Sequence, residues 1–175
     1  MKRLGFLAAL GLFGCAGAPE GIVAVKGFEL HRYLGKWYEI ARLDHSFERG
    51  LINVTATYSL ADDGTVRVLN RGYDPGRKRW KEATGKARFS SSPDIGQLKV
   101  SFFGPFYGGY NIIELDQAAY SYALVCGPSR AYLWILSREP KLEAAVQNRL
   151  VDKARELGFD TKKLVFVSQE DVPGE

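Results

Sequence analysis

The chain has 175 residues, of which 46% are hydrophobic, 24 are Lys or Arg and 20 are Asp or Glu. Lys2 and Arg3 lie in a predicted export signal that contains no acidic residue, so the net charge falls from +4 to +2 when the signal is removed. This nearly balanced charge, with no basic run interleaved with aromatic residues, argues against a nucleic-acid-binding protein.

Residues 1–14 have the form of a lipoprotein signal peptide. Two basic residues at the start precede an apolar run from Leu4 to Phe13, which is too short to span a bilayer stably. The sequence Leu-Phe-Gly-Cys at residues 12–15 resembles a bacterial lipoprotein cleavage box. That resemblance implies that Cys15 carries acyl chains such as palmitate and anchors the mature protein. An ordinary secretory signal with an incidental Cys15 is the alternative.

Residues 15–27 are predicted to be the acylated Cys and a tether. In the sorting pattern that the cleavage box resembles, Asp after the Cys retains a lipoprotein at the inner membrane. Ala16 therefore implies the outer membrane, with the protein lipid-anchored at the periplasmic face. A proline and three glycines without a helical period make an extended tether the expectation for residues 17–27. Residues 28–175 then form the folded domain.

Between residues 37 and 137 the chain repeats one pattern, in which short strand-like segments alternate with turns rich in Gly, Pro, Asp and Asn. Sequential strands without a long crossover predict an up-and-down antiparallel sheet. Such a sheet removes its edges by closing into a barrel, which can hold one small ligand. A β-sandwich is the alternative. The eight expected strands are residues 37–44, 52–60, 65–73, 79–89, 97–103, 109–115, 119–126 and 131–137.

Helical segments are expected on both sides of the strand series. Residues 28–34 can form one helical turn, and a longer helix is predicted from Pro140 to Gly158. Its outward face mixes acidic and basic residues, so we expect it to pack outside the barrel rather than on a membrane. Residues 163–167 are predicted as a last short strand. The apolar stripe of the helix consists of Leu142, Ala145, Val146, Leu150, Ala154 and Leu157.

A Gly-x-Trp motif opens the strand series, and an Arg closes it. The motif is Gly35 and Trp37, and Arg138 follows the last strand; an Arg stacked on an indole contributes about 0.5–2 kcal/mol. This pairing resembles the lipocalins, and residues 115–120 resemble a loose form of their second motif. The similarity covers nearly the whole chain after residue 27, and points to bacterial outer-membrane lipocalins, related to apolipoprotein D. It implies an all-β, eight-stranded barrel with one C-terminal helix outside.

Alternate strand residues predict an apolar interior with a few polar ends. Tyr58, Asn70, Tyr110 and Tyr132 bring polar groups into this apolar wall. A few polar groups in an apolar cavity are typical of a small-ligand site, whereas a barrel packed solid is the alternative. By resemblance to apolipoprotein D, the ligand cavity is expected to include Tyr58, Asn70, Phe102 and Trp134.

Strand direction places Trp37 and Arg138 at one end of the barrel, so the mouth lies at the other end. Basic residues gather there, with Arg77 and Arg79 in a turn and Arg42 at a strand edge. We expect an acyl chain to enter the barrel while an anionic or zwitterionic head group binds these cations. The resemblance favours fatty acids and phospholipids, lysophospholipids first. Basic loops that only aid solubility are the alternative.

Two further features concern partners. The aromatic, glycine-rich loop at residues 103–109 could cap the cavity, touch a membrane or bury against a second copy. The resemblance favours the third, a homodimer. Cys126 is expected to be a buried apolar side chain; a reactive thiol or a disulfide between two copies is the alternative.

Catalytic and metal-binding patterns are missing from the sequence. His31 and His45 lie in different segments without metal-ligand spacing, and there is no GxSxG or phosphate-binding loop. We therefore predict a lipid-binding outer-membrane lipocalin, without enzymatic activity or cofactor, that stores or transports lipids for membrane maintenance. A structural envelope lipoprotein with a filled barrel is one alternative. A binder of a haem-like ring, weakly favoured by His45, is another.

Overall fold

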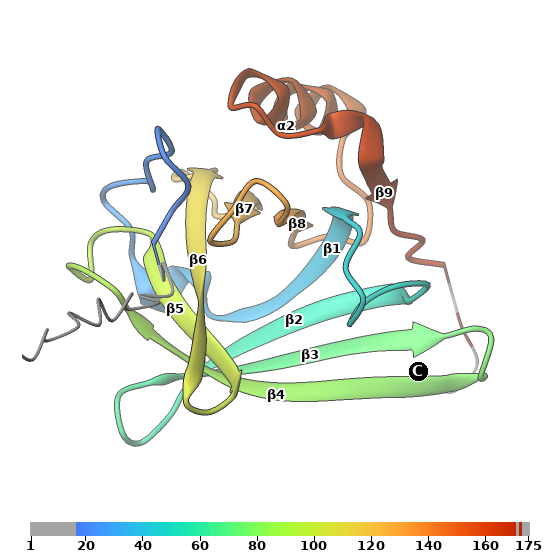
Figure 1. Cartoon of the computed structure of the whole chain (residues 1–175), viewed down its shortest axis with the longest axis horizontal. Coiled ribbons are helices and arrows are strands. Elements are labelled where there is room, and N and C mark those ends of the chain that lie inside the picture. The colour runs from blue at the N-terminus through green and yellow to red at the C-terminus, as the bar shows by residue number, and fades with distance from the viewer. Residues whose placement is uncertain (1–16, 171, 173–175) are drawn as a thin grey trace, which may run out of the picture.

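The computed structural model describes residues 17–170 and 172, and Figure 1 shows their arrangement. The expected eight-stranded antiparallel barrel is confirmed. Strands β2 to β8 pair in sequence order, β8 pairs with β1, and β1 pairs with β2, which closes the barrel. The short β9 adds to β1 from outside the series of eight. The strands are β1 (Gly35–Leu43), β2 (Ile52–Leu60), β3 (Val66–Asp74), β4 (Arg79–Phe89), β5 (Gln97–Phe103), β6 (Phe106–Leu115), β7 (Tyr122–Cys126), β8 (Leu133–Ser137) and β9 (Leu164–Phe166).

Some strand boundaries differ from the expectation, and the turns explain why. β6 begins three residues early, because only Gly104 and Pro105 separate it from β5. β7 begins three residues late, since Tyr120 has a φ of 55° and belongs to the turn. The carboxylate of Asp116 accepts hydrogen bonds from the backbone N–H groups of Ala118 and Ala119, which stabilises that turn.

The described part of the chain contains three helical segments besides the strands. α1 (Leu30–Tyr33) lies just before β1, and the 3-10 helix η1 (Thr161–Lys163) precedes β9. The long helix α2 (Ala144–Glu156) packs outside the barrel, as expected (Figure 1). It begins four residues after Pro140, because the backbone of Arg138 still bonds to Ser121 and residues 138–141 form a bend. No helix in the described part of the chain is long and apolar enough to cross a membrane.

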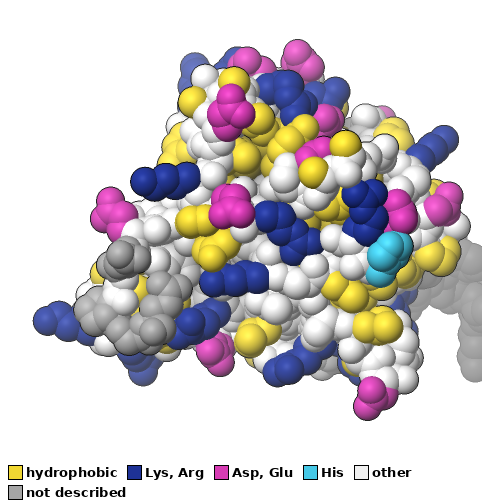
Figure 2. Space-filling view, turned by 180° about the vertical axis from the view of Figure 1, so that it is seen from behind, with side chains coloured by type: hydrophobic (Ala, Val, Ile, Leu, Met, Phe, Trp, Pro, Cys, Tyr) yellow, Lys and Arg dark blue, Asp and Glu magenta, His cyan; other side chains and the backbone are white. Residues whose placement is uncertain are grey.

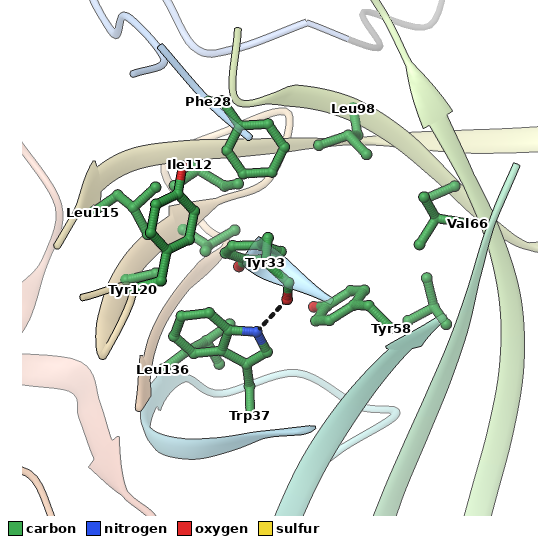
Figure 3. Packing of buried hydrophobic residues seen from close by; sticks show 14 residues of the cluster. Phe28, Tyr33, Trp37, Tyr58, Val66, Leu98, Ile112, Leu115, Tyr120 and Leu136 are labelled. Carbon is green, nitrogen blue, oxygen red and sulfur yellow. Dashed lines mark hydrogen bonds between the residues drawn. The ribbon is translucent and has the colours of Figure 1, made fainter. Parts of the chain in front are cut away.

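Apolar side chains form two separate clusters. The inner cluster fills the closed end of the barrel and contains Trp37, Val66, Val68 and Leu136, among others (Figure 3). The outer cluster lies between the barrel and α2, where Leu150 and Ala154 are fully buried. Barrel residues therefore alternate between the two clusters, which is the pattern that half-buried strands require. On the face shown in Figure 2, acidic and basic side chains are interspersed.

The segments that flank the barrel are attached to it. Residues 17–27 do not form the free tether that was expected, since Ile22 and Ala24 are buried. The N–H of Val25 donates to the carbonyl of Ile112 at 2.9 Å. At the other end of the chain, the side-chain amide of Gln169 donates to the carbonyl oxygens of Glu39 and Val54. This tail bridges β1 and β2 beyond the point where their direct pairing stops at Tyr38.

Candidate ligand-binding site

At the closed end of the barrel, Arg138 lies over Trp37. The guanidinium carbon is 4.0 Å from the centre of the indole ring, and the indole N–H donates to the carbonyl of Tyr33 at 2.8 Å. Gly35 has a φ of 97°, and a Cβ atom there would be 3.3 Å from Arg138 Nη1. A side chain at this position would therefore crowd the Arg. The guanidinium also donates to the carbonyl oxygens of Arg32, Leu34, Lys36 and Tyr120.

Three tyrosine hydroxyls meet above this closed end and form what we call the tyrosine floor: Tyr33, Tyr58 and Tyr110. The Tyr110 hydroxyl lies 2.7 Å from each of the other two, and Figure 3 shows the rings of Tyr33 and Tyr58 close together. Burial raises the pKa of all three hydroxyls, so they stay protonated. Because two hydrogen bonds use two of the three protons, one hydroxyl donor is left for another acceptor.

The wall of the barrel above the tyrosine floor is only half-buried. Ala56, Asn70, Val100, Tyr110 and Trp134 all keep intermediate exposure. Four of them pack against the inner cluster, and Asn70 shares the face of the buried Val66 and Val68. The barrel is thus filled at its closed end, whereas the inward-facing side chains above that end are partly accessible to solvent. We call the part of the interior that these side chains face the lumen.

Phe102, which is also predicted to line the cavity, is more exposed than Tyr58, Asn70 and Trp134. It is 36% exposed and is not part of the inner cluster. A bulge between Val100 and Phe103 disturbs the alternation of side chains at the end of β5. The ring lies over Gly85, where a Cβ atom would come within 2.8 Å of it. Phe102 helps to line a groove of about 460 Å³, which also includes Arg67, Thr84, Lys86 and Tyr107.

At the mouth, three charged side chains form what we call the mouth triad: Glu39, Arg42 and Glu48. A bulge after Glu39 in β1 sends both Ile40 and Ala41 to the outer cluster. Glu39 and Arg42 therefore share the inner side although they are three residues apart. Arg42 was expected at an exposed basic edge, but it is 1% exposed. Its Nη1 donates to Glu39 Oε1 at 2.7 Å, and its Nη2 donates to the backbone carbonyl of Glu48 at 2.8 Å.

The triad is joined to the wall of the lumen. The indole N–H of Trp134 donates to Glu48 Oε2 at 3.1 Å. Burial raises the pKa of both carboxylates, that of Glu39 to about 8, and the charge of Glu48 adds to the shift of Glu39. The charges of both acids also raise the pKa of Tyr58. The tyrosine floor and the mouth triad therefore lie within electrostatic reach of each other.

His45 lies beside this triad in an aromatic stack. Its ring is 4.4 Å from that of Tyr132 and 5.3 Å from that of Phe47, nearly parallel to both. Burial lowers the pKa of His45, so the imidazole is neutral at physiological pH. No group of three or more His, Cys, Asp or Glu side chains in the described residues could hold a metal ion.

The basic turn predicted to hold a head group lies away from the lumen. Arg77 and Arg79 are exposed at the tip of the β3–β4 hairpin, which extends beyond the turn of β5 and β6 (Figure 1). β5 pairs with β4 only from Lys86 to Phe89. Arg77 bonds to Asp74 at 3.2 Å, and Lys81 to the same carboxylate at 2.8 Å. Arg77 and Lys81 are thus paired within the hairpin.

Two remaining expectations concern the aromatic loop and the cysteines. Phe103 and Phe106, at the tip of the β5–β6 hairpin, are 82% and 77% exposed. Cys126 is a free, fully buried thiol in the outer cluster, and burial raises its pKa to about 12. It is therefore a protonated apolar side chain. Cys15 lies outside the described residues.

Sequence reasoning missed three residues of this region: Tyr33, Glu39 and Glu48. Tyr33 had an available signal, since it stands four residues before Trp37 in the predicted helical turn. Glu39 had one as well, because it stands two residues after Trp37 and so lies on the same face of the strand. Glu48 had none, because it lies in the loop after β1, where no alternation gives a direction. Of the residues predicted for the site, Tyr58, Tyr110 and Trp134 belong to the inner cluster or pack against it. Arg77 and Arg79 lie at the tip of the β3–β4 hairpin.

Comparison with known proteins gives consistent results. A family model described as a lipocalin-like domain matches residues 28–169. A Vibrio cholerae protein named outer membrane lipoprotein Blc is 54% identical over 164 residues, covering 94% of this chain and 96% of that protein. The Escherichia coli K12 protein of the same name is 56% identical over 151 residues, covering 86% and 85%.

More distant relatives extend the same pattern. Mouse apolipoprotein D is 30% identical over 155 residues, covering 85% of this chain and 80% of that protein. The solved structure of insecticyanin from the tobacco hornworm Manduca sexta superimposes with a TM-score of 0.69 at 22% identity, covering 88% of this chain and 87% of that chain. The latter likeness supports the fold alone.

Proposed function

This chain belongs to the lipocalin family, and we propose that it binds fatty acids or phospholipids, above all lysophospholipids, at the outer membrane. In this proposal residues 1–14 are removed as a signal peptide, and acylated Cys15 anchors the protein at the periplasmic face. The names of the bacterial relatives, outer membrane lipoproteins, support this location. The protein would store or carry single-chain lipids for membrane maintenance.

The observation that carries this proposal is the half-open lumen above the tyrosine floor. Its apolar wall (Ala56, Val100, Trp134) is accessible to solvent, whereas the closed end is packed. Burying an acyl chain against such a wall contributes about 25 cal/mol per Å² of apolar surface. The free hydroxyl donor of the floor adds one polar contact. No reaction is required, so we propose a binding protein rather than an enzyme.

The experiment is native mass spectrometry of the chain from Ala16 onward, which keeps every residue that the structure describes but not the anchor. Organic extraction then identifies any bound lipid. We expect a co-purified single-chain lipid that is lost in Trp134→Ala. Trp80→Phe, on the β3–β4 hairpin, is the control and should keep the lipid.

The second candidate function is a structural envelope lipoprotein, favoured by the tight packing of the closed end. Protein that carries no lipid, and whose tryptophan fluorescence does not change when lysophospholipid is added, would decide for this candidate. That outcome would contradict the carrier function.

We also propose that the protein forms a homodimer, because Phe103 and Phe106, which pair across the β5–β6 hairpin, form an exposed apolar pair of the kind that marks interaction surfaces. Light scattering over a range of concentrations should show a dimer that Phe103→Ser with Phe106→Ser dissociates. A monomer at every concentration would contradict this.

A further inference from the structure

The mouth triad holds two carboxylates but only one guanidinium. Glu39 is 4% exposed, Arg42 1% and Glu48 7%, so water screens little of their charge. Arg42 is the only Lys or Arg among the buried residues of the described part. It binds the carboxylate of Glu39 and only the backbone of Glu48. When both acids are ionised, the triad is one positive charge short.

Two polar atoms near the triad also have no hydrogen-bond partner among the described residues. Trp134 donates to one oxygen of Glu48, and no described residue donates to the other. The ring of His45 is 5.4 Å from that of Trp134, and its Nε2 is buried without a hydrogen-bond partner in the described residues. His45 itself is 8% exposed. Aromatic rings around such acceptors add further attraction for a cation.

We propose that the mouth triad binds an ammonium group, and that it thereby selects single-chain lipids whose head group ends in an ammonium. An ammonium supplies the missing positive charge, and its N–H donors fit the free oxygen of Glu48 and the ring nitrogen of His45. An ethanolamine-type head fits better than a quaternary one, since only the former has N–H donors. This inference rests on the lipid-binding function proposed above.

The titration of the triad agrees with this geometry. Burial and the charge of Glu48 raise the pKa of Glu39 to about 8. Below this pH Glu39 therefore holds a proton, which supplies the positive charge that a bound cation would otherwise supply. Burial also lowers the pKa of His45, which leaves its imidazole neutral and able to accept a hydrogen bond.

A head group that ends in an anion would have to share the one buried guanidinium with Glu39. Nη1 and Nη2 of Arg42 are already bound to Glu39 and to the backbone carbonyls of Glu48 and Leu51, and only its buried Nε–H has no partner among the described residues. Repulsion between like charges across a binding site lowers the affinity for the ligand. The expected discrimination therefore favours ammonium heads over glycerol heads, which share the phosphate but lack the positive charge.

The test compares lysophosphatidylethanolamine with lysophosphatidylglycerol of the same acyl chain, below the concentration at which micelles form. Binding to the chain from Ala16 onward is measured by calorimetry. We expect the ethanolamine lipid to bind about tenfold more tightly, and Glu48→Gln to remove that preference. The amide oxygen still accepts from Trp134, so only the charge is lost. Glu82→Gln removes an exposed acid from the hairpin and should leave the preference intact.

Glu39→Gln is measured in parallel above the pKa of about 8, where the carboxylate is ionised, because it keeps an acceptor for Arg42 and then removes the other charge of the triad. It should also reduce the preference for the ethanolamine lipid. Equal affinity of the unmodified protein for the two lipids, or an equal loss for both lipids in the two variants, overturns the ammonium site while lipid binding stands. Failure to bind any single-chain lipid, fatty acid included, overturns the proposed function together with it.

Discussion

Each end of the barrel holds one arginine with several hydrogen-bond partners, but the two charges are compensated in different ways. Arg138, at the closed end, stacks on Trp37 and donates to backbone carbonyls of four residues. Arg42, at the mouth, faces two acids and leaves an acceptor unfilled on Glu48. Buried polar groups that are fully hydrogen-bonded stabilise one structure, whereas a buried group with an unused acceptor can bind a further donor. This difference indicates a stabilising role for the closed end and supports the binding role proposed for the mouth.

Removing the closed-end arginine should have the largest effect. Arg138→Ala loses several charge-assisted hydrogen bonds and the contact with the indole, so we expect the free energy of unfolding to fall by about 3 kcal/mol. Denaturation in urea followed by circular dichroism measures this. The control is Arg149→Ala, whose bond to Glu114 is on the surface and contributes at most about 1 kcal/mol. Equal losses in both variants would contradict a special role for the closed end.

The carboxylates of the mouth should make the free energy of unfolding depend on pH. Unfolded Glu39 loses its proton near pH 4.5, whereas the folded protein holds it until a pKa of about 8. Between these values the unfolded state binds fewer protons, so stability falls as the pH rises, by up to about 1.4 kcal/mol per pH unit. Glu39→Gln should flatten this dependence in denaturant titrations between pH 5 and pH 8 (a window set by the cited pKa values). A slope as steep as that of the unmodified protein would refute the assignment.

The tyrosine floor should show an intermediate effect. Tyr110→Phe removes the hydroxyl that takes part in both hydrogen bonds, while Tyr58→Phe removes an end of the chain of hydroxyls. We expect losses in the free energy of unfolding of about 2 and about 1 kcal/mol, respectively. Thermal and urea denaturation of the two variants measure the difference. A larger loss in Tyr58→Phe would mean that the hydroxyls are not linked through Tyr110.

The smallest effect is expected at the basic hairpin. Reversing the charges of Arg77, Lys78 and Arg79 should change lysophospholipid affinity by no more than about twofold, because exposed charges far from a ligand are screened by salt. Calorimetry with a lysophospholipid and a fatty acid tests this. If the reversal weakens phospholipid binding more than fatty-acid binding, the hairpin, not the mouth triad, holds the head group.

Much of the fold followed from local patterns. Alternating residues and turn signals placed all eight barrel strands, and the spacing of Leu150 and Ala154 identified the buried face of α2. Boundaries were less predictable where tertiary contacts override local preference. Pro140 suits a helix start, yet α2 begins only at Ala144, after the bend that follows Arg138. Residues 17–27 read as a tether, yet Ile22 and Ala24 are buried against the barrel.

The candidate site followed from sequence only in part. Regular alternation puts Tyr58, Tyr110 and Trp134 on one face, and their packing with the inner cluster agrees with this. A bulge between Val100 and Phe103 interrupts the alternation near Phe102. The charge of the mouth was also predicted only in part, because a count of basic residues along the sequence suggested a basic mouth. Pairing in space instead leaves Arg42 bound to Glu39 and the hairpin arginine Arg77 bound to Asp74.

The sequence by itself determined the barrel, its outer helix, its closed end and its family, because these depend on periodicity, turn chemistry and motifs that neighbouring residues carry. Only the tertiary structure decided the chemistry of the mouth. Glu39 and Arg42 share the lumen because one bulge shifts the alternation of β1, and Glu48 reaches Trp134 across 86 residues of sequence. The balance of charge in such a buried site depends on distances between strands, which no local pattern encodes.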